Sequence, residues 1–387
     1  MLKINLFQID NLQFDYSVIN YPGFLPFMIN IYPCEPMQES SSSMELIKNA
    51  IKADYPSTII NFINQYSPKA CEAILECFYI EQQGAIATYE NSDNTQAFHL
   101  DGDGIDFLCV SSFNSGNERY EEAFNNNSQA LSAQKHTYSD VFRQWNYIPN
   151  ICEHSNTTAC EIIGRSEQNE YSKFNEVRKK YYGKAGIRNY PAATGIGISG
   201  EKFGLITLSI KGHAQSYYLE NDLQVSAFDY SNDIIKQSSI KQSSNQTEES
   251  HSLAKPLFSR ALILTNNDIT NNHITNNKQV QAMLSGTAAI RGEESQCDNV
   301  LEQLIITQEN INHLLSANNI KRQTPLSISR VEPLSLKVYI KSNSLAEEIS
   351  QMIPKEFATE QILIVVADIC RKELLIEIEG IFNLIPD

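Results

Sequence analysis

The amino-acid sequence predicts an α+β fold in which mixed β-sheets carry helices on one face. Within the 387 residues, the stretch 260–378 shows the order strand, strand, helix, strand, helix, strand, strand. Residues 140–211 repeat the strand, helix, strand, strand part of this order at similar lengths, a pattern typical of an internal duplication. We therefore expect two domains, at 1–230 and 256–387, joined by a polar linker at 231–255.

Periodicity assigns the elements of the C-terminal half. Residues 298–315 place their apolar side chains on one side of a helix. Residues 334–341 alternate as a strand, and Ser344 with Glu347 gives a capping box for a second helix that we expect to end at Pro354. Further strands are expected at 260–264, 281–290, 361–367 and 374–378.

The N-terminal half is assigned in the same way. A helix is expected at 169–182, where Tyr171, Phe174 and Val177 fall on one side. Strands are expected at 75–80, 85–89, 107–111, 140–148, 191–198 and 203–211, and helices at 44–53 and 57–66. Two polar segments interrupt the chain, at 231–252 with IKQSS in tandem and at 265–277 with ITNN repeated. Such tracts bury too little apolar surface to offset their ordering entropy, so we expect mobile loops there.

Composition excludes several classes of protein. The net charge of −16 leaves no basic stripe for non-specific binding to nucleic acid. No apolar run reaches the length of a membrane span, and the N-terminus lacks the apolar core of a signal peptide. The eight cysteines form no CxxC pair and no histidine cluster completes a metal site, so we expect reduced thiols, no metal and a cytoplasmic location.

Residues 285–295, SGTAAIRGEES, hold the most informative pattern for chemistry. A strand leads into a turn, and the acidic pair Glu293 and Glu294 then precedes a helix. Upstream Arg260 heads a strand, and downstream Arg371 lies beside another. Arginine binds a carboxylate in a bidentate fork, and a carboxylic acid moves a proton. The pattern predicts an enzyme, or at least a binding site, for a small anionic molecule.

Four blocks in this order resemble the chorismatase family. They are QWNYIPNI at 144–151, a helix with Tyr171, Phe174, Asn175 and Arg178, the turn PAATGIG at 191–197, and the C-terminal set FSRA, SGTAAIRGEE and ADICRKELLIEIEG. The resemblance covers residues 135–387. It implies two RidA/YjgF-like (chorismate-mutase-like) domains and an enzyme that removes pyruvate from chorismate without a metal or organic cofactor. We also expect a monomer.

The resemblance implies that Glu294, in the C-terminal domain, is the catalytic acid. The family has Gly-His-Glu here, so Glu294 matches the acid, while Glu293 stands in place of the histidine and is the second choice. Arg291 stands where the family tends to have an apolar residue. The acid must stay protonated near neutral pH, which burial and an adjacent carboxylate favour. Judged by local sequence alone, an acid at a helix N-terminus is equally explained by the helix dipole.

Three arginines are candidates for binding the substrate carboxylates. Arg260 is the first choice, because an arginine at the mouth of an apolar strand needs an anionic partner. Arg371 and Arg178 are expected to support it. Arg178 lies on a helix rich in Lys and Glu, so a solvated position is an alternative for it.

The remaining candidates surround the expected substrate ring. Tyr147 shares a strand face with Trp145, and that face is either core or pocket wall. Tyr182 would cap the ring, although core packing is equally compatible, and Thr194 would bind a carboxylate unless it only forms a turn. The small side chains Gly195, Thr287 and Ala288 are expected to select the product.

Chorismate carries two carboxylates and an enolpyruvyl ether, so two products are possible. We favour 3-hydroxybenzoate over a dihydroxycyclohexadiene carboxylate. Two other functions stay open. One is a RidA-like imine or enamine deaminase, and the other is a non-catalytic small-molecule binding protein.

Overall fold

The structure is a computed structural model, and it describes the chain apart from residues 1, 11–13, 35–38, 40, 64, 66, 70, 82–83, 103, 154–168, 240–253 and 267–279. Most of the two polar segments for which we expected mobile loops therefore lies outside the described residues.

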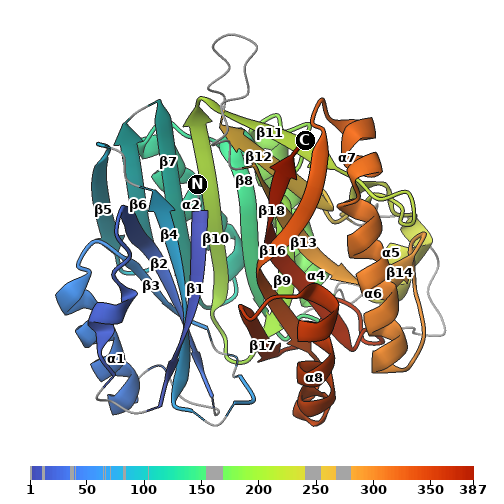
Figure 1. Cartoon of the computed structure of the whole chain (residues 1–387), viewed down its shortest axis with the longest axis horizontal. Helices are drawn as coiled ribbons and strands as arrows, with labels where there is room; N and C mark the ends of the chain where they lie inside the picture. The colour runs from blue at the N-terminus through green and yellow to red at the C-terminus, as the bar shows by residue number, and fades with distance from the viewer. Residues whose placement is uncertain are drawn as a thin grey trace, which may run out of the picture.

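Three main sheets organise the described residues (Figure 1). The first, in the order β1-β4-β2-β3, contains β1 (Leu2–Ile9), β2 (Phe24–Pro33), β3 (Ile59–Phe62) and β4 (Ala73–Glu81), with helix α1 (Ser42–Asp54) between β2 and β3. The second, in the order β5-β6-β7-β10-β8-β9, contains β5 (Ile86–Ser92), β6 (Thr95–Gly102), β7 (Ile105–Asn114), β8 (Val141–Pro149), β9 (Ala192–Ile198) and β10 (Phe203–Gly212). Its helices are α2 (Arg119–Ala133) and α4 (Glu170–Lys184).

The third sheet has the order β11-β12-β13-β18-β16-β17. It contains β11 (Ala214–Leu219), β12 (Ala261–Asn266), β13 (Val280–Ala288), β16 (Ile328–Ile340), β17 (Ile362–Val366) and β18 (Ile376–Pro386), with helices α6 (Val300–Leu314), α7 (Ala317–Gln323) and α8 (Ala346–Phe357). Outside the main sheets, β14 (Ile290–Arg291) pairs with β15 (Glu294–Ser295), and α5 (Asn232–Ser239) follows β11.

The second and third sheets share one topology. Their strand orders superimpose position by position, and each ends in a parallel pair, β8 with β9 and β16 with β17. The α+β class and the duplication predicted from the sequence are thereby confirmed. The first sheet repeats the last four positions of this order, including the parallel pair β2 with β3. The fold therefore contains two full copies and one shortened copy of the same unit.

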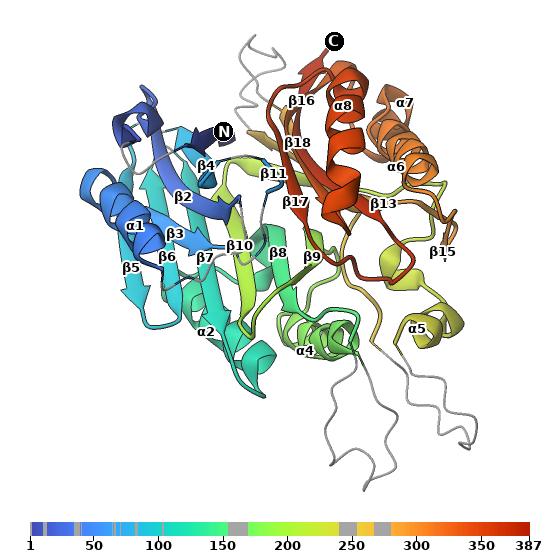
Figure 2. The ribbon, with the colours of Figure 1, turned by 90° about the horizontal axis from the view of Figure 1, so that it is seen from below.

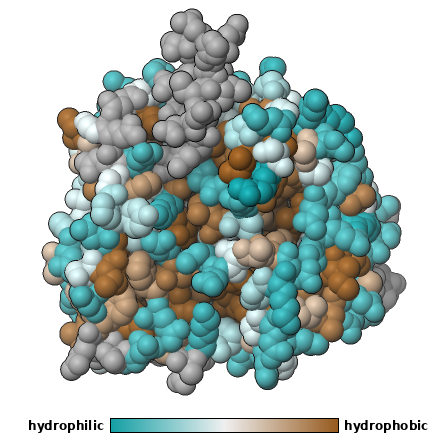
Figure 3. Space-filling view, viewed as in Figure 1, coloured by the Kyte–Doolittle hydropathy of each residue, from teal (hydrophilic) through white to brown (hydrophobic). Residues whose placement is uncertain are grey.

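The helices lie on the outer side of the three sheets, as Figure 2 shows from below. Separate apolar clusters join α1 to the first sheet, α2 and α4 to the second, and α6, α7 and α8 to the third. The opposite faces of all three sheets meet in one central core. On the face seen in Figure 3, polar residues cover most of the surface and apolar residues gather near the centre. None of the described helices is both long and apolar enough to cross a membrane.

Several local expectations were wrong. Residues 59–62, within the helix that we expected at 57–66, form strand β3, because their side chains are buried on both faces of the first sheet. Pro354 lies inside α8, which continues to Phe357. The third sheet includes β11, which precedes the linker that we expected at 231–255. The first part of that expected linker forms helix α5. The domain limits themselves stay a prediction.

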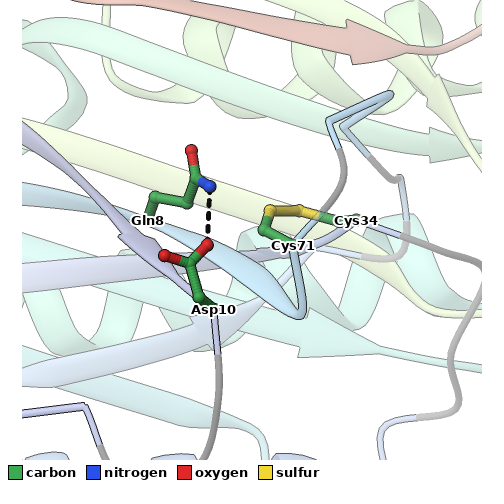
Figure 4. The surroundings of a disulfide bond; sticks show 4 residues. All are labelled: Gln8, Asp10, Cys34 and Cys71. Carbon is green, nitrogen blue, oxygen red and sulfur yellow. Dashed lines mark hydrogen bonds between the residues drawn. A yellow bond between two sulfur atoms is a disulfide. The ribbon is translucent and has the colours of Figure 1, made fainter.

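The cysteines also differ from expectation, because Cys34 and Cys71 form a disulfide (Figure 4). Cys34 follows β2 and Cys71 precedes β4. Because Pro33 of β2 pairs with Ala73 of β4, the Cα atoms of the two cysteines lie 5.5 Å apart. The prediction of reduced thiols is therefore wrong for this pair. The two cysteines are 37 residues apart in the sequence, so their spacing gave no sign of the disulfide.

Candidate active site

A cavity lies where the second sheet meets the third. Strand β9 packs beside β13, and isolated bridges join Ala192 to Ser259 and Ile196 to Ile369. The cavity has an empty volume of about 630 Å³, counting space open to solvent. Its walls come from α4, α5, β13, β18 and the segments before β12 and after β17. Residues far apart in the sequence therefore converge on one site.

Glu377 supplies the acidic group of this cavity. It lies on β18, opposite Ala288 of β13, and is 4% exposed. Burial, reinforced by the nearby charge of Glu379, raises the pKa of Glu377 to about 8, although Arg260 and Arg143 act in the opposite direction. No hydrogen bond or ion pair joins its carboxyl group to another described side chain. Glu377 is thus a carboxylic acid that keeps its proton at neutral pH and is free to meet a ligand.

Gly286 makes room for this carboxyl group. A register shift in β13 between Leu284 and Thr287 places Gly286 beside β18, and a Cβ atom there would overlap Oε1 of Glu377. The Gly286 amide donates to Oγ1 of Thr194 at 3.1 Å, which ties the bulge to β9. The glycine is therefore required by close approach to the acid.

Arg260 brings a buried positive charge to the cavity. It is 2% exposed, and its Nη2 donates to the carbonyl of Val225 and to the hydroxyl of Tyr230, each at 2.8 Å. Its Nε has no hydrogen-bond partner, and it forms no ion pair with any described carboxylate. Glu220 accepts a hydrogen bond from the Arg260 backbone amide at 3.3 Å and acts on the guanidinium only through its charge. An anionic ligand bound directly to the buried guanidinium would therefore stabilise it further.

Arg371 provides a second guanidinium. Its Nη1 donates to the carbonyl of Glu293 at 2.8 Å and to Oγ of Ser295 at 3.2 Å. The Tyr230 ring lies between the two arginines, 5.7 Å from Cζ of Arg260 and 5.3 Å from Cζ of Arg371. The chain is acidic overall, yet this cavity is locally positive and suits an anion.

The structure brings together part of the predicted set. Arg260, Arg371 and Ala288 line the cavity. Thr194 and Gly195 lie just behind the cavity wall. Thr194 accepts a hydrogen bond from the lining residue Gly286, and Gly195 packs against the ring of Tyr171, which also lines the cavity.

The other predicted binding residues are buried outside the lining. Arg178 donates to Oδ1 of Asn175 at 2.6 Å, Tyr182 donates to Oε1 of Gln144 at 2.7 Å, and Thr287 donates to the carbonyl of Ser285 at 2.9 Å. Tyr147 lies in the central core with its hydroxyl 3.3 Å from that of Tyr32.

The acidic pair singled out from the sequence lies in a different environment from the one its expected role requires. Glu294 is exposed on β15, and α6 begins only at Val300. Glu293 accepts a hydrogen bond from the backbone of Ser231 at 2.7 Å, which holds the pKa of Glu293 below its usual value. Neither residue is buried, and neither lines the cavity.

Sequence reasoning missed the residues that complete the cavity: Glu377, Tyr171, Asn175, Tyr230 and Cys370. A signal for Glu377 was present, because two acidic residues alternate with isoleucine in the strand sequence IEIEG. Charged residues on one face of an otherwise apolar strand need a functional or paired role.

Glu379, the second acid of that strand, belongs to a buried network behind the cavity. It accepts hydrogen bonds from Trp145 and Tyr339, at 3.0 Å each, and from Thr194 and Arg143. Nζ of Lys337 lies 3.2 Å from Oε1 of Glu379 and 2.9 Å from Oε2 of Glu76. Burial alone would raise the pKa of Glu379, but Lys337 and Arg143 outweigh it and hold that pKa below its usual value.

The repeated topology shows which residues of the other two units correspond to Glu377. Tyr32, Tyr147 and Tyr339 occupy matching positions on β2, β8 and β16, and they pair with Ile74, Gly204 and Glu377. The other two copies of the unit thus carry an isoleucine and a glycine where the third carries Glu377. Among these copies the acid is present only at the cavity between the second and third sheets.

Comparisons with known proteins agree with this architecture. Residues 85–209 match the family model described as "Chorismatase FkbO/Hyg5-like, N-terminal". A 3-hydroxybenzoate synthase from Streptomyces hygroscopicus is 25% identical over 249 residues, which are 63% of this chain and 64% of the relative. The match therefore spans slightly less than two thirds of that relative.

A crystal structure of a chorismatase superimposes with a TM-score of 0.69 at 18% identity and covers 98% of each chain, which shows a common fold. The chain therefore has the fold of a chorismatase, and its residues 85–209 match the N-terminal chorismatase model.

Proposed function

We propose that this protein cleaves chorismate to release pyruvate, with Glu377 as the general acid in place of Glu294. The observation that carries the proposal is Glu377 itself. It is a buried carboxyl group with a pKa of about 8 that lines a cavity with two arginines. The match of residues 85–209 to a chorismatase model and the similarity to a 3-hydroxybenzoate synthase support the substrate class.

The charges of the cavity suit a dicarboxylate. The guanidinium groups of Arg260 and Arg371 both lie near the Tyr230 ring, and neither forms an ion pair with a described carboxylate. Each guanidinium can bind one carboxylate of chorismate in a bidentate fork. Arg178 and Thr194 would act indirectly, by holding two lining residues in place. Arg178 donates a hydrogen bond to Asn175, and Thr194 accepts one from the amide of Gly286.

The reaction begins when Glu377 protonates the terminal methylene carbon of the enolpyruvyl ether. Protonation of carbon is the difficult step, and it requires an acid that is still protonated at neutral pH. The resulting oxocarbenium ion is captured by water or by the neighbouring ring hydroxyl. Breaking the bond between the ring-side oxygen and the former enol carbon releases pyruvate, and Glu377 recovers a proton from the attacking hydroxyl through solvent.

The product depends on which oxygen captures the cation. Capture by the ring hydroxyl gives a cyclic ketal. Loss of the ring proton at the ether carbon and cleavage of the bond between the ring and the former hydroxyl oxygen then aromatise the ring and leave a hemiketal, which collapses to 3-hydroxybenzoate and pyruvate with no net gain or loss of water. Capture by water instead gives a dihydroxycyclohexadiene carboxylate. We favour 3-hydroxybenzoate, with support from the name of the Streptomyces relative. Ala288 in the lining and Gly195 against Tyr171 are the small side chains that would set this choice, while Thr287, next to Ala288 in β13 but outside the lining, would act on it only indirectly.

An imine or enamine deaminase is the other candidate, and the acid discriminates between the two. Such a reaction needs an arginine for the substrate carboxylate and an oriented water, and it makes no use of a neutral acid with a raised pKa. A cavity with Glu377 beside Arg260 therefore favours ether cleavage.

A direct test is to incubate the purified chain with chorismate and to follow pyruvate with a coupled lactate dehydrogenase assay. We expect pyruvate together with an ultraviolet-absorbing aromatic acid on chromatography. A diene diol as sole product would keep the reaction and overturn the favoured product. Folded protein that releases no pyruvate above background between pH 6 and pH 9 would remove the proposal.

A further inference from the structure

Three potential metal ligands meet at the edge of the second sheet, away from the proposed active site. They are His99 on β6, Asp106 on β7 and His136 after α2, and their ligand atoms all lie within 4.8 Å of one another. We propose that these three side chains form a binding site for a divalent transition-metal ion of the zinc class. This proposal is independent of the proposed reaction.

The two imidazoles converge on the same atom. Nε2 of His99 lies 2.8 Å from Oδ1 of Asp106, and Nε2 of His136 lies 2.7 Å from that same oxygen. The rings are nearly perpendicular, with an interplanar angle of 84°. Two nitrogens and one oxygen that face a common point are the donor set of a three-ligand zinc site with a fourth position left for water.

The backbone holds all three residues in place. Asp106 lies at the turn of the β6–β7 hairpin, where it pairs with Asp101, and His99 is on the same strand two residues before Asp101. Lys135 adopts a left-handed conformation with a φ of 61°, which ends α2, and the amide of His136 then donates to the carbonyl of Leu131 at 2.8 Å. Ligands fixed by regular structure need little ordering when an ion binds.

Burial and charge leave one side of the cluster accessible. The His136 side chain is fully buried, while those of His99 and Asp106 are 16% and 26% exposed. Nζ of Lys211 lies 3.4 Å from Oδ2 of Asp106 and also donates to the carbonyl of Lys135 at 3.0 Å. The ammonium therefore engages the outer carboxylate oxygen, as an outer partner of a metal-binding carboxylate does, and leaves Oδ1 to the site.

The donor types limit the ion. Imidazole nitrogen suits Zn²⁺, Co²⁺, Ni²⁺ and Cu²⁺, whereas Ca²⁺ and Mg²⁺ prefer sites made of oxygen. Without an ion, Nε2 of each ring lies at hydrogen-bond distance from the same carboxylate oxygen. Metal binding would replace both of these hydrogen bonds with bonds to the metal.

Co²⁺ is the probe, because its visible absorption reports the ligand set. Cys297 has an exposed thiol that could also bind the ion, so every titration uses the Cys297→Ser background. We expect one equivalent of Co²⁺ to give visible bands without thiolate charge transfer, and Zn²⁺ to displace it. His99→Gln and Asp106→Asn should each weaken binding at least ~10-fold, the usual scale for losing a ligand or its partner.

A matched control is His213→Gln. His213 lies beside the same hairpin, against Gly104, but is not one of the three ligands, so its replacement should leave Co²⁺ binding unchanged. Circular dichroism checks that each variant is folded, and His136→Gln is omitted because that ring is fully buried. No saturable binding at about 100 µM Co²⁺ or Zn²⁺, or binding that survives both His99→Gln and Asp106→Asn, would overturn the proposal.

Discussion

The carboxyl group of Glu377 and the backbone of Gly286 touch across two paired strands, and a Cβ atom at position 286 would overlap Oε1 of the acid. The register shift in β13 thus creates the space that lets a buried carboxyl group face the cavity. Because no other described side chain bonds to that carboxyl, its environment is set by burial, by Glu379 and by the two arginines Arg260 and Arg143.

Glu377→Gln should abolish most of the pyruvate release. The amide keeps the shape of the side chain and removes the transferable proton, so turnover should fall at least ~100-fold with chorismate binding largely kept. The matched control is Glu294→Gln, at an exposed position, which should cost less than ~3-fold. A large loss with Glu294→Gln and a small one with Glu377→Gln would return the acid to the position that sequence resemblance implied.

The pH dependence of kcat/KM should show a single loss of activity at high pH. The active form carries a protonated Glu377, whose pKa is about 8 in the free protein. Activity should therefore be retained as pH rises from 6 to 7 and should then fall about tenfold per pH unit well above 8. An activity that increases through pH 8 would mean that the reaction uses a deprotonated group.

The same carboxyl group should make stability depend on pH in a defined direction. In the unfolded chain Glu377 titrates near 4.5, and in the folded chain near 8. Between these values the unfolded state loses the proton while the folded state keeps it, so folding becomes less favourable as pH rises. Below pH 4.5 the acid is protonated in both states, and above about 8 the loss is complete.

Thermal and urea unfolding of the protein and of Glu377→Gln measure this effect. From pH 5 to pH 9, the variant should gain on the order of 4 kcal/mol relative to the unchanged protein, since the pKa rises from 4.5 to about 8 on folding and one pKa unit corresponds to about 1.4 kcal/mol. Equal stability differences at both pH values would show that Glu377 has an ordinary pKa.

Gly286→Ala should inactivate the protein by displacing the acid. The added methyl group would overlap Oε1 of Glu377 and lie 3.2 Å from Cγ2 of Thr194, so the carboxyl group has to move. We expect a loss of kcat of at least ~10², because a displacement of about 1 Å has that effect on a positioned group. Gly183→Ala, at a position with no atom within 4 Å of the added group, is the control and should keep full activity.

Arg260→Lys should weaken substrate binding more than it lowers stability. Lysine keeps the charge but loses the bidentate fork, so KM for chorismate should rise about tenfold or more. Arg330→Lys, at an arginine that is 68% exposed, provides the matched control and should change nothing. An unaltered KM for Arg260→Lys would transfer the carboxylate site to Arg371.

The sequence by itself determined most of the regular elements. The apolar stripe of 300–314 and the alternation of 334–341 are local patterns, and burial against one sheet face is the physical reason that they appear in the sequence. The repeated order of these elements also established the α+β class. The first sheet was harder to predict. Its strand β3 is only four residues long and buried throughout, so it shows neither the alternation of a half-buried strand nor the one-sided stripe of a helix.

The tertiary structure alone decided which residues form the site. Arg260, Arg371 and Ala288 were found from sequence, because charge or small size at a strand end is a local signal. For the acid, the resemblance implied Glu294 whereas we propose Glu377, since the exposure of Glu294 depends on a short hairpin and the burial of Glu377 depends on the pairing of β13 with β18. A carboxyl group has its pKa raised by the residues that exclude water from it, and for Glu377 these come from segments that lie far apart in the chain, from α4 to β18.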